Sequence, residues 1–330
     1  MSGIIIGVVI VALIFEFING FHDTANAIAT SVYTRALTAG KAIVLAAGMN
    51  FCGALVSEHV AKTISSGLVG VEIEEYVVLA ALLGAIIWNL ITWWQGIPSS
   101  SSHALIGSLI GATIVRTASL DGVIWSGVAQ KVLIPLVASP FIGFFVGFGL
   151  MKLIYRLCQN QTPGKVNGLF AKLQVASAAL VAFSHGTNDA QKTMGIITLA
   201  LVSGSVLPAD AGVPLWVKVV CAVAIATGTS VGGWKIMKTM GGGVTKLQPP
   251  GGFAAQASAT AVIEGMSMVG APISTTHVIT SAVMGVGSAK RLSAVKWGKA
   301  KDIVLTWCIT LPIAAALGGA CTFLIQLLFV

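Results

Sequence analysis

About ten apolar segments, each close to the length of a membrane crossing, follow one another along this chain. A crossing helix needs about 20 mostly apolar residues, because the hydrocarbon core of a bilayer is about 30 Å thick. The segments are 3–34, 41–57, 76–95, 97–115, 122–155, 172–206, 214–234, 253–269, 272–289 and 302–330. No polar stretch between them is long enough for a soluble domain. The sequence therefore predicts one all-α, polytopic membrane protein.

The charge content supports this prediction and excludes several classes of protein. Only 9% of the 330 residues are charged and 56% are hydrophobic, whereas an average soluble chain carries about 25% charged residues. So few polar side chains cannot cover a soluble enzyme or a nucleic-acid binder, and they do not fit a disordered chain. The net charge of +8 is interpreted as Lys and Arg in cytoplasmic loops. The five cysteines form no C-x-x-C pair, so no metal site is expected.

The basic residues also predict an orientation in the membrane. If every segment crosses once, the connections rich in Lys and Arg all lie on one side. The positive-inside rule places that side in the cytoplasm and both termini outside the cytoplasm. The first segment has neither a basic n-region nor a small-residue cleavage site, so we expect a retained span.

Two short motifs occur twice, which predicts an internal repeat. GFHDTANA at 20–27 corresponds to GTNDAQKT at 186–193, and GIPSSSSH at 96–103 corresponds to GAPISTTH at 270–277. Each half would hold an odd number of segments, so the second half would enter the membrane from the opposite face. We expect about 10–12 transmembrane or re-entrant helices in two inverted-topology repeats, with broken helices at the midplane. The repeats are 1–155 and 172–330, joined by a basic cytoplasmic linker at 156–171.

The first motif places polar side chains inside an apolar segment, where each costs about 2.5–3.5 kcal/mol on insertion scales and usually marks function. Gly20 permits a break in the helix. Oxygens of Asp23 and Asn26, with backbone carbonyls freed at such a break, suit a small hard cation such as sodium. The further residues expected at cation sites are Asn19, Asn188 and Asp189. The alternative is a helix kink in which these polar groups satisfy one another.

The second motif is typical of a helix start, because Gly and Pro precede a hydroxyl run and an apolar stretch. A helix N-terminus has free N–H groups and a positive dipole end, which bind anions. Two such starts from opposite faces can meet near the midplane. The hydroxyls expected at this oxyanion site are Ser100, Ser101, Ser102, Ser274, Thr275 and Thr276. The alternative is capping of re-entrant helices or close helix packing.

Lys192 aligns with Asn26 and breaks the symmetry of the repeat. Its ammonium group could replace a bound cation, pair with Asp189 or contact the substrate; the alternative is snorkelling to an interface. We hypothesise that one half lacks a full sodium site, so that coupling uses protons or a metal–anion complex. Other titratable residues in or beside apolar segments have proton-relay or structural roles. They are His22, His103, His185, His277, Glu16 and Glu264.

Together these motifs resemble those of the inorganic phosphate transporter (PiT) family, and most closely its bacterial branch. The family's G-x-N-D-x-x-N signature is matched loosely by GFHDTANA and closely by GTNDAQK, and the paired P-S-S-S-S-H and P-I-S-T-T-H stretches are also similar. The resemblance covers the whole chain. It departs at His22, a position that is often Asn, and at Lys192.

The resemblance implies a secondary symporter of inorganic phosphate, free or as a metal complex, driven by sodium or protons. It implies a homodimer in the lipid bilayer of the cytoplasmic membrane, with no cofactor beyond the coupling ion and no nucleic-acid partner. It also implies that Asp23, Asn26, Asp189 and Lys192 take part in cation and phosphate binding, and that the hydroxyl runs cradle phosphate.

Three other functions fit parts of the sequence. A sulfate or related oxyanion permease would use the same hydroxyls, since these groups do not separate tetrahedral oxyanions. A cation channel or exchanger would use the Asp pair alone and leave the Ser-rich helix starts without a role. An intramembrane hydrolase would use Ser, His and Asp as a triad, but the duplicated serine runs argue against a unique nucleophile.

Overall fold

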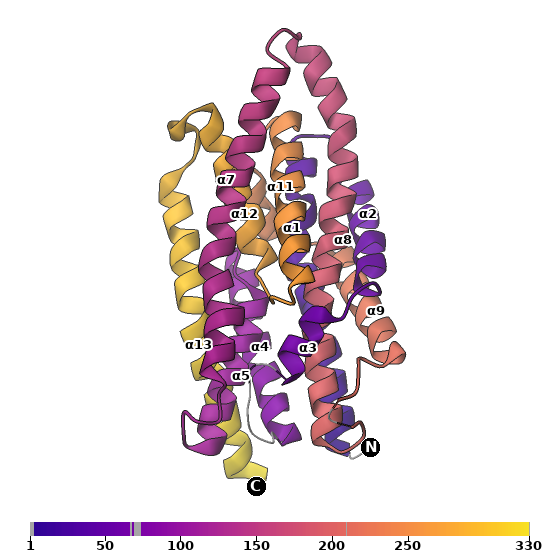
Figure 1. Ribbon diagram of the computed structural model, residues 1–330, viewed down its shortest axis with the longest axis vertical. Helices are drawn as coiled ribbons and strands as arrows, with labels where there is room; N and C mark the ends of the chain where they lie inside the picture. Colours follow the sequence, from indigo (N-terminus) through magenta and orange to yellow (C-terminus); the bar gives the residue numbers. More distant parts are fainter. Residues whose placement is uncertain (1–2, 67, 69–73, 209, 330) are drawn as a thin grey trace.

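The computed structural model describes residues 3–66, 68, 74–208 and 210–329, and this part of the chain forms a bundle built of helices (Figure 1). The α-helices are α1 (Gly3–Tyr33), α2 (Ala39–Ala54), α3 (His59–Ser66), α4 (Glu75–Gln95), α5 (Ser101–Thr117), α6 (Trp125–Gly127), α7 (Ile134–Leu157), α8 (Pro163–Ser203), α9 (Leu215–Val231), α10 (Trp234–Lys238), α11 (Pro249–Met268), α12 (Thr275–Lys290) and α13 (Trp297–Phe329). Two π-helices, η1 (Val128–Leu133) and η2 (Thr239–Gly243), and a 3-10 helix, η3 (Leu292–Ala294), join them. The predicted all-α fold is confirmed.

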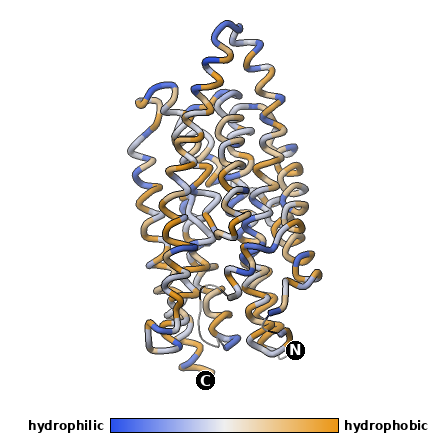
Figure 2. Tube along the Cα trace, viewed as in Figure 1, coloured by the Kyte–Doolittle hydropathy of each residue, from blue (hydrophilic) through white to orange (hydrophobic). Residues whose placement is uncertain are grey.

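Within the described residues, five helical stretches are long and apolar enough to cross a membrane. They are α1, α4, α8, α13 and the continuous α6–η1–α7 stretch. The pairs α2–α3 and α9–α10, bent by 68° and 61°, bring the number to seven if each is one span. Large apolar side chains on the outer helices, such as Phe141, Phe145 and Phe323, are exposed. Such a surface suits contact with lipid, and Figure 2 shows hydrophilic residues gathered mainly at the ends and in the middle of the bundle.

The shorter helices α5 and α12, of 17 and 16 residues, lie inside the bundle. Residues 101–113 of α5 and 275–289 of α12 are all buried. Each helix follows a reversal of the chain at a glycine, Gly96 or Gly270, whose φ of 69° lies in the left-handed region that favours glycine. In Figure 1 the α4–α5 hairpin lies in the lower half of the bundle and the α11–α12 hairpin in the upper half.

The two halves of the chain make equivalent helix contacts. Helix α1 packs on α9 as α8 packs on α2, and α5 packs on α13 as α12 packs on α7. A Cβ added at Gly53 would lie 2.1 Å from the Phe183 carbonyl oxygen, and one at Gly228 would lie 2.1 Å from that of Phe17. These matched close approaches agree with the predicted repeat, whereas the opposite orientation of the halves in a membrane stays a prediction.

The two long helices that carry the Asp motifs are continuous. The break expected near Gly20 is absent, because α1 runs unbroken from Gly3 to Tyr33, and α8 is likewise unbroken. Gly20 and its counterpart Gly186 instead permit close packing, since an added Cβ would lie 2.5 Å and 2.3 Å from neighbouring backbone oxygens. Residues 18–31 and 184–198 are completely buried, so their polar side chains face other helices.

Both termini lie at one end of the bundle in Figure 1, and the connection between α7 and α8 lies at the other end. This arrangement agrees with the predicted placement of the termini and the central connection on opposite sides. Which side faces the cytoplasm stays a prediction. Of the linker predicted at 156–171, only 158–162 lie outside helices, because α7 ends at Leu157 and α8 begins at Pro163.

Candidate functional site

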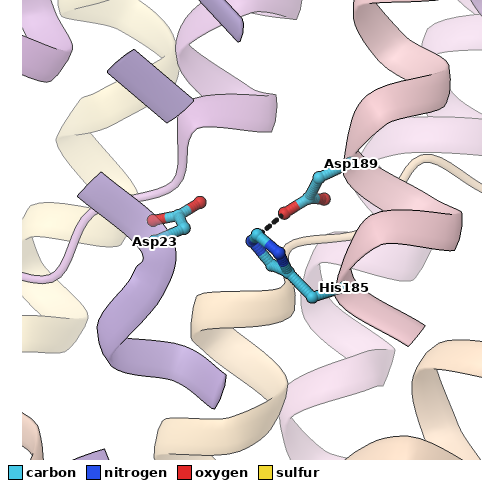
Figure 3. Close-up of side chains that lie close together, drawn as sticks. All are labelled: Asp23, His185 and Asp189. Atoms are coloured by element: carbon cyan, nitrogen blue, oxygen red, sulfur yellow. Dashed lines mark ion pairs between the residues drawn. The ribbon is translucent and has the colours of Figure 1, made fainter. Parts of the chain in front are cut away.

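Two buried carboxylates face each other at the centre of the bundle, Asp23 on α1 and Asp189 on α8. Figure 3 shows them on either side of His185, and the ligand atoms of these three residues lie within 4.8 Å of one another. Carboxylates this close repel each other unless donors or positive charges compensate. The three residues could share a metal ion, whereas the sequence analysis expected no metal site.

Hydroxyl and imidazole groups surround Asp23. The Ser101 hydroxyl donates to Asp23 Oδ2 at 2.5 Å and lies 2.7 Å from Asn19 Oδ1. His22 Nδ1 lies 2.7 Å from Asp23 Oδ1, and Thr276 Oγ1 lies 3.4 Å from that same oxygen. Groups from α1, α5 and α12 thus meet at this carboxylate.

The second carboxylate, Asp189, has a fixed positive charge beside it. Lys192 lies one turn further along α8 and donates to Asp189 Oδ1. Thr275 donates to Asp189 Oδ2 at 2.9 Å, and His185 Nε2 lies 3.0 Å from this oxygen. Lys192 therefore pairs with Asp189 and does not snorkel to an interface, because its side chain is only 3% exposed.

The ammonium of Lys192 also links the tips of the two hairpins. It donates to the Ser102 hydroxyl of α5 and, at 2.9 Å, to the carbonyl oxygen of Ile273 just before α12. The Ser102 hydroxyl in turn donates to the same carbonyl oxygen at 3.2 Å.

The six predicted hydroxyl residues divide into two groups. Ser100 and Ser274 are helix caps, each accepting the N–H of the histidine three residues later at 3.2 Å. The hydroxyls that reach the Asp and Lys residues of α1 and α8 are those of Ser101, Ser102, Thr275 and Thr276. The Asn26 amide joins them by donating to Thr276 at 2.9 Å and to Thr275 at 3.3 Å. Capping is thus the structural role of Ser100 and Ser274.

His103 and His277 lie against each other, with ring centroids 4.9 Å apart, and His277 stacks on Trp307 at 4.0 Å. Both histidines are buried. Among the described residues, no hydrogen-bond partner is present for their ring nitrogens. The ring contacts of these two histidines join α5 to α12 and α13.

The remaining predicted residues lie around this centre. Asn188 donates to Ser267 at 2.7 Å, and Glu16 accepts the Thr193 hydroxyl. Glu264 lines a surface cavity of about 510 Å³ that also includes Ser267. In the described part of the chain, neither glutamate pairs with Lys192, whose ammonium is directed at Asp189.

Several polar residues outside the predicted set hold the site residues in place. Asn50 on α2 accepts from His185 Nδ1 at 3.0 Å, and its amide donates to Thr229 at 2.8 Å. On α4, Thr92 Oγ1 lies 3.1 Å from His22 Nε2. Asn50 and Thr92 are polar interruptions of predicted apolar segments, but neither belongs to a repeated motif. The only sign of their role in the sequence is that each is a polar residue within an apolar segment.

A helical bundle with several candidate membrane spans and an oxygen-rich centre between two hairpin tips is typical of a polytopic membrane transporter. The family model described as "Phosphate transporter family" matches residues 19–318, and the chain belongs to this family. The resemblance found in the motifs is thereby confirmed. The chain is a transporter and not an intramembrane hydrolase.

Several named relatives extend over nearly the whole chain. A Bacillus subtilis (strain 168) protein named "Probable low-affinity inorganic phosphate transporter" is 48% identical over 325 residues, which cover 98% of this chain and 97% of that protein. A protein of the same name from Rhizobium meliloti (strain 1021) is 46% identical, covering 97% and 96%. The solved structure named "The sodium-dependent phosphate transporter" matches with a TM-score of 0.86 and 27% identity, covering 99% of this chain and 100% of that chain.

Proposed function

We propose that this protein carries inorganic phosphate across the cytoplasmic membrane by symport with sodium ions or protons, through alternating access to the central site. The named relatives support phosphate as the substrate, and the solved neighbour supports sodium. The observation that carries the proposal is the convergence of hydroxyls from two helix N-termini on two buried carboxylates.

Phosphate is a compact anion with oxygen acceptors on all sides, so its site must supply many donors. The hydroxyls of Ser101, Ser102, Thr275 and Thr276 are such donors. The N–H groups of the first two residues of α5 and α12 add further donors, since the first turn of a helix has no intrahelical partners for them. The positive dipole ends of both helices favour an anion at the same place.

The hydrogen bonds of the hydroxyls supply a physical reason for cation coupling. Ser101 and Thr275 each have one hydroxyl proton, which they donate to Asp23 and Asp189. To donate to phosphate instead, each hydroxyl must leave its carboxylate. A buried acceptor that loses its donor costs about 1–3 kcal/mol, and more if it is charged. A cation or proton that takes the donor's place removes this cost, so ion binding and phosphate binding favour each other.

The charges of the buried centre also favour cation coupling. Among the described residues, the buried centre holds the carboxylates of Asp23 and Asp189 and the ammonium of Lys192. Phosphate brings one or two further negative charges. Buried charges are tolerated only when they are paired, so phosphate needs accompanying positive charge. This requirement favours a symporter over an uncoupled anion pathway.

Alternating access follows if the two halves, 1–155 and 172–330, move about the central site as inverted repeats joined by 156–171. We assign the surface cavity lined by Glu58, Lys218 and Glu264 to an access route. It reaches Ser267, which accepts from Asn188, the residue beside Asp189. We also propose that the protein is a homodimer with both termini outside the cytoplasm.

Uptake of labelled phosphate by proteoliposomes tests this function, with sodium and proton gradients imposed separately. Wild-type protein should accumulate phosphate only under an inward cation gradient. Asp23→Asn should abolish accumulation, while the matched control Asp210→Asn, at an exposed loop acid, should not change it. Normal uptake by Asp23→Asn refutes the role of this carboxylate.

The same proteoliposomes separate the alternatives. Excess sulfate should leave phosphate uptake unchanged, and preferential uptake of sulfate would instead establish a sulfate permease. Ion currents or cation exchange that ignore both anions would establish a channel or exchanger.

A further inference from the structure

We propose that the ammonium of Lys192 is a built-in replacement for one coupling cation. By this inference, which rests on the proposed symport, the protein binds a mobile cation beside Asp23 and keeps a covalently attached one beside Asp189. Each transport cycle then uses one cation fewer than a site with a mobile cation in both halves.

The surroundings of the Lys192 ammonium are those of a bound hard cation. Its nitrogen contacts three oxygens of different kinds: a carboxylate oxygen of Asp189, the hydroxyl of Ser102 and the carbonyl of Ile273. Carboxylate, hydroxyl and carbonyl oxygens are the ligands that hard metal cations prefer. The three contacts come from α8 and from the tips of both hairpins. An ammonium has three protons, so these contacts use its full donor capacity.

The equivalent position in the first half lacks such a charge. Asn26 follows Asp23 by three residues, as Lys192 follows Asp189, so each pair shares one helix face. Thr276 lies 2.9 Å from the Asn26 amide nitrogen and 3.4 Å from Asp23, which places the two side chains together. Asn26 Oδ1 is buried and has no hydrogen-bond partner among the described residues. In the first half, Asn26 Oδ1 therefore has no hydrogen-bond donor among the described residues and lies near the Asp23 carboxylate. A mobile cation can bind there.

The difference between the halves has a thermodynamic consequence. A tethered ammonium neutralises Asp189 throughout the cycle, but it cannot cross the membrane and so carries no gradient energy. A mobile cation contributes its gradient each time it moves with phosphate. For a tenfold ion gradient, each additional coupled ion raises the limiting accumulation ratio of phosphate about tenfold.

Lys192→Asn tests the inference, because it installs the residue that the first half has at this position. In proteoliposomes the variant should need sodium beyond the wild-type requirement. Its Hill coefficient for sodium should rise by about one, and its limiting phosphate accumulation under a tenfold sodium gradient should rise about tenfold. The matched control is Lys165→Asn, at an exposed position on α8, which should keep the wild-type values. Wild-type sodium dependence in Lys192→Asn overturns the inference.

A binding measurement covers variants that fold but do not transport. The melting temperature of purified Lys192→Asn, and of the longer amide variant Lys192→Gln, should rise more with sodium chloride than that of the wild type, since a ligand stabilises the state that binds it. Choline chloride at equal ionic strength is the control. If both folded variants gain no extra stabilisation from sodium, the inference is wrong. Absence of phosphate uptake by the wild type would refute the proposed symport, whereas the sodium shift still reports on the lysine.

Discussion

Replacing Asp189 by asparagine should destabilise the protein by about 3–5 kcal/mol, and adding Lys192→Met should restore most of that loss. The side chains of Asp189 and Lys192 are 1% and 3% exposed, so water cannot compensate a charge left alone. Two unit charges about 3 Å apart attract by about 5–6 kcal/mol at an effective dielectric constant of about 20. The Asn variant loses this attraction, while Ser102 and the Ile273 carbonyl remain as uncharged partners of the ammonium.

The double variant should behave differently because neither charge is then buried without its partner. Free energies of unfolding from reversible SDS titration, followed by tryptophan fluorescence, provide the double-mutant cycle. We expect a coupling energy of at least about 2 kcal/mol. The control Glu74→Gln breaks the exposed pair with Arg116 and should cost at most about 1 kcal/mol. The reasoning is refuted if Asp189→Asn costs no more than this control, or if the double variant is less stable than Asp189→Asn.

Three further results are expected. Gly186→Ala should lower the stability by about 1–3 kcal/mol, because its Cβ would lie 2.3 Å from the Asn50 carbonyl oxygen. The control Gly7→Ala, where no atom lies within 4 Å of the added Cβ, should keep the wild-type stability. Equal melting temperatures of the two variants would contradict this prediction. Thr193→Val should lower the free energy of unfolding, measured by SDS titration, by about 1–3 kcal/mol, since it removes the hydroxyl that donates to buried Glu16. An unchanged free energy of unfolding would show that the fold does not need this hydrogen bond. Alkaline phosphatase fused to the C-terminus should be active in cells, because both termini are predicted outside the cytoplasm, and an inactive but stable fusion would reverse the orientation.

Much of the candidate site could be predicted from the sequence, because its polar residues are concentrated in repeated motifs. Asp23 and Asp189 stand out as charges in apolar segments, and they occupy equivalent positions in the repeated motif. The hydroxyl runs were likewise visible as helix starts. The sequence did not show which hydroxyl caps the helix and which reaches the carboxylate. Ser100 and Ser101 are adjacent serines, and the helix begins between them.

The role of glycine in the first motif illustrates a limit of local patterns. Gly20 permits either a helix break or a close helix crossing, and the break is what the motif predicts. The structure shows the crossing, because the backbone of α9 approaches Gly20 directly. Glycine tolerates both arrangements, and the packing of the neighbouring helix determines which of the two forms.

Composition and apolar periodicity determined that this chain is a helical membrane protein, since the transfer of apolar segments into lipid depends on local sequence. The repeated motifs predicted two related halves. The three-dimensional packing was needed to choose among the partners open to Lys192 and to bring His103 against His277. These contacts depend on which helices, distant in sequence, pack around the same buried volume. Buried charges and hydrogen-bond donors must find partners there, and local sequence patterns do not show which residues will be present.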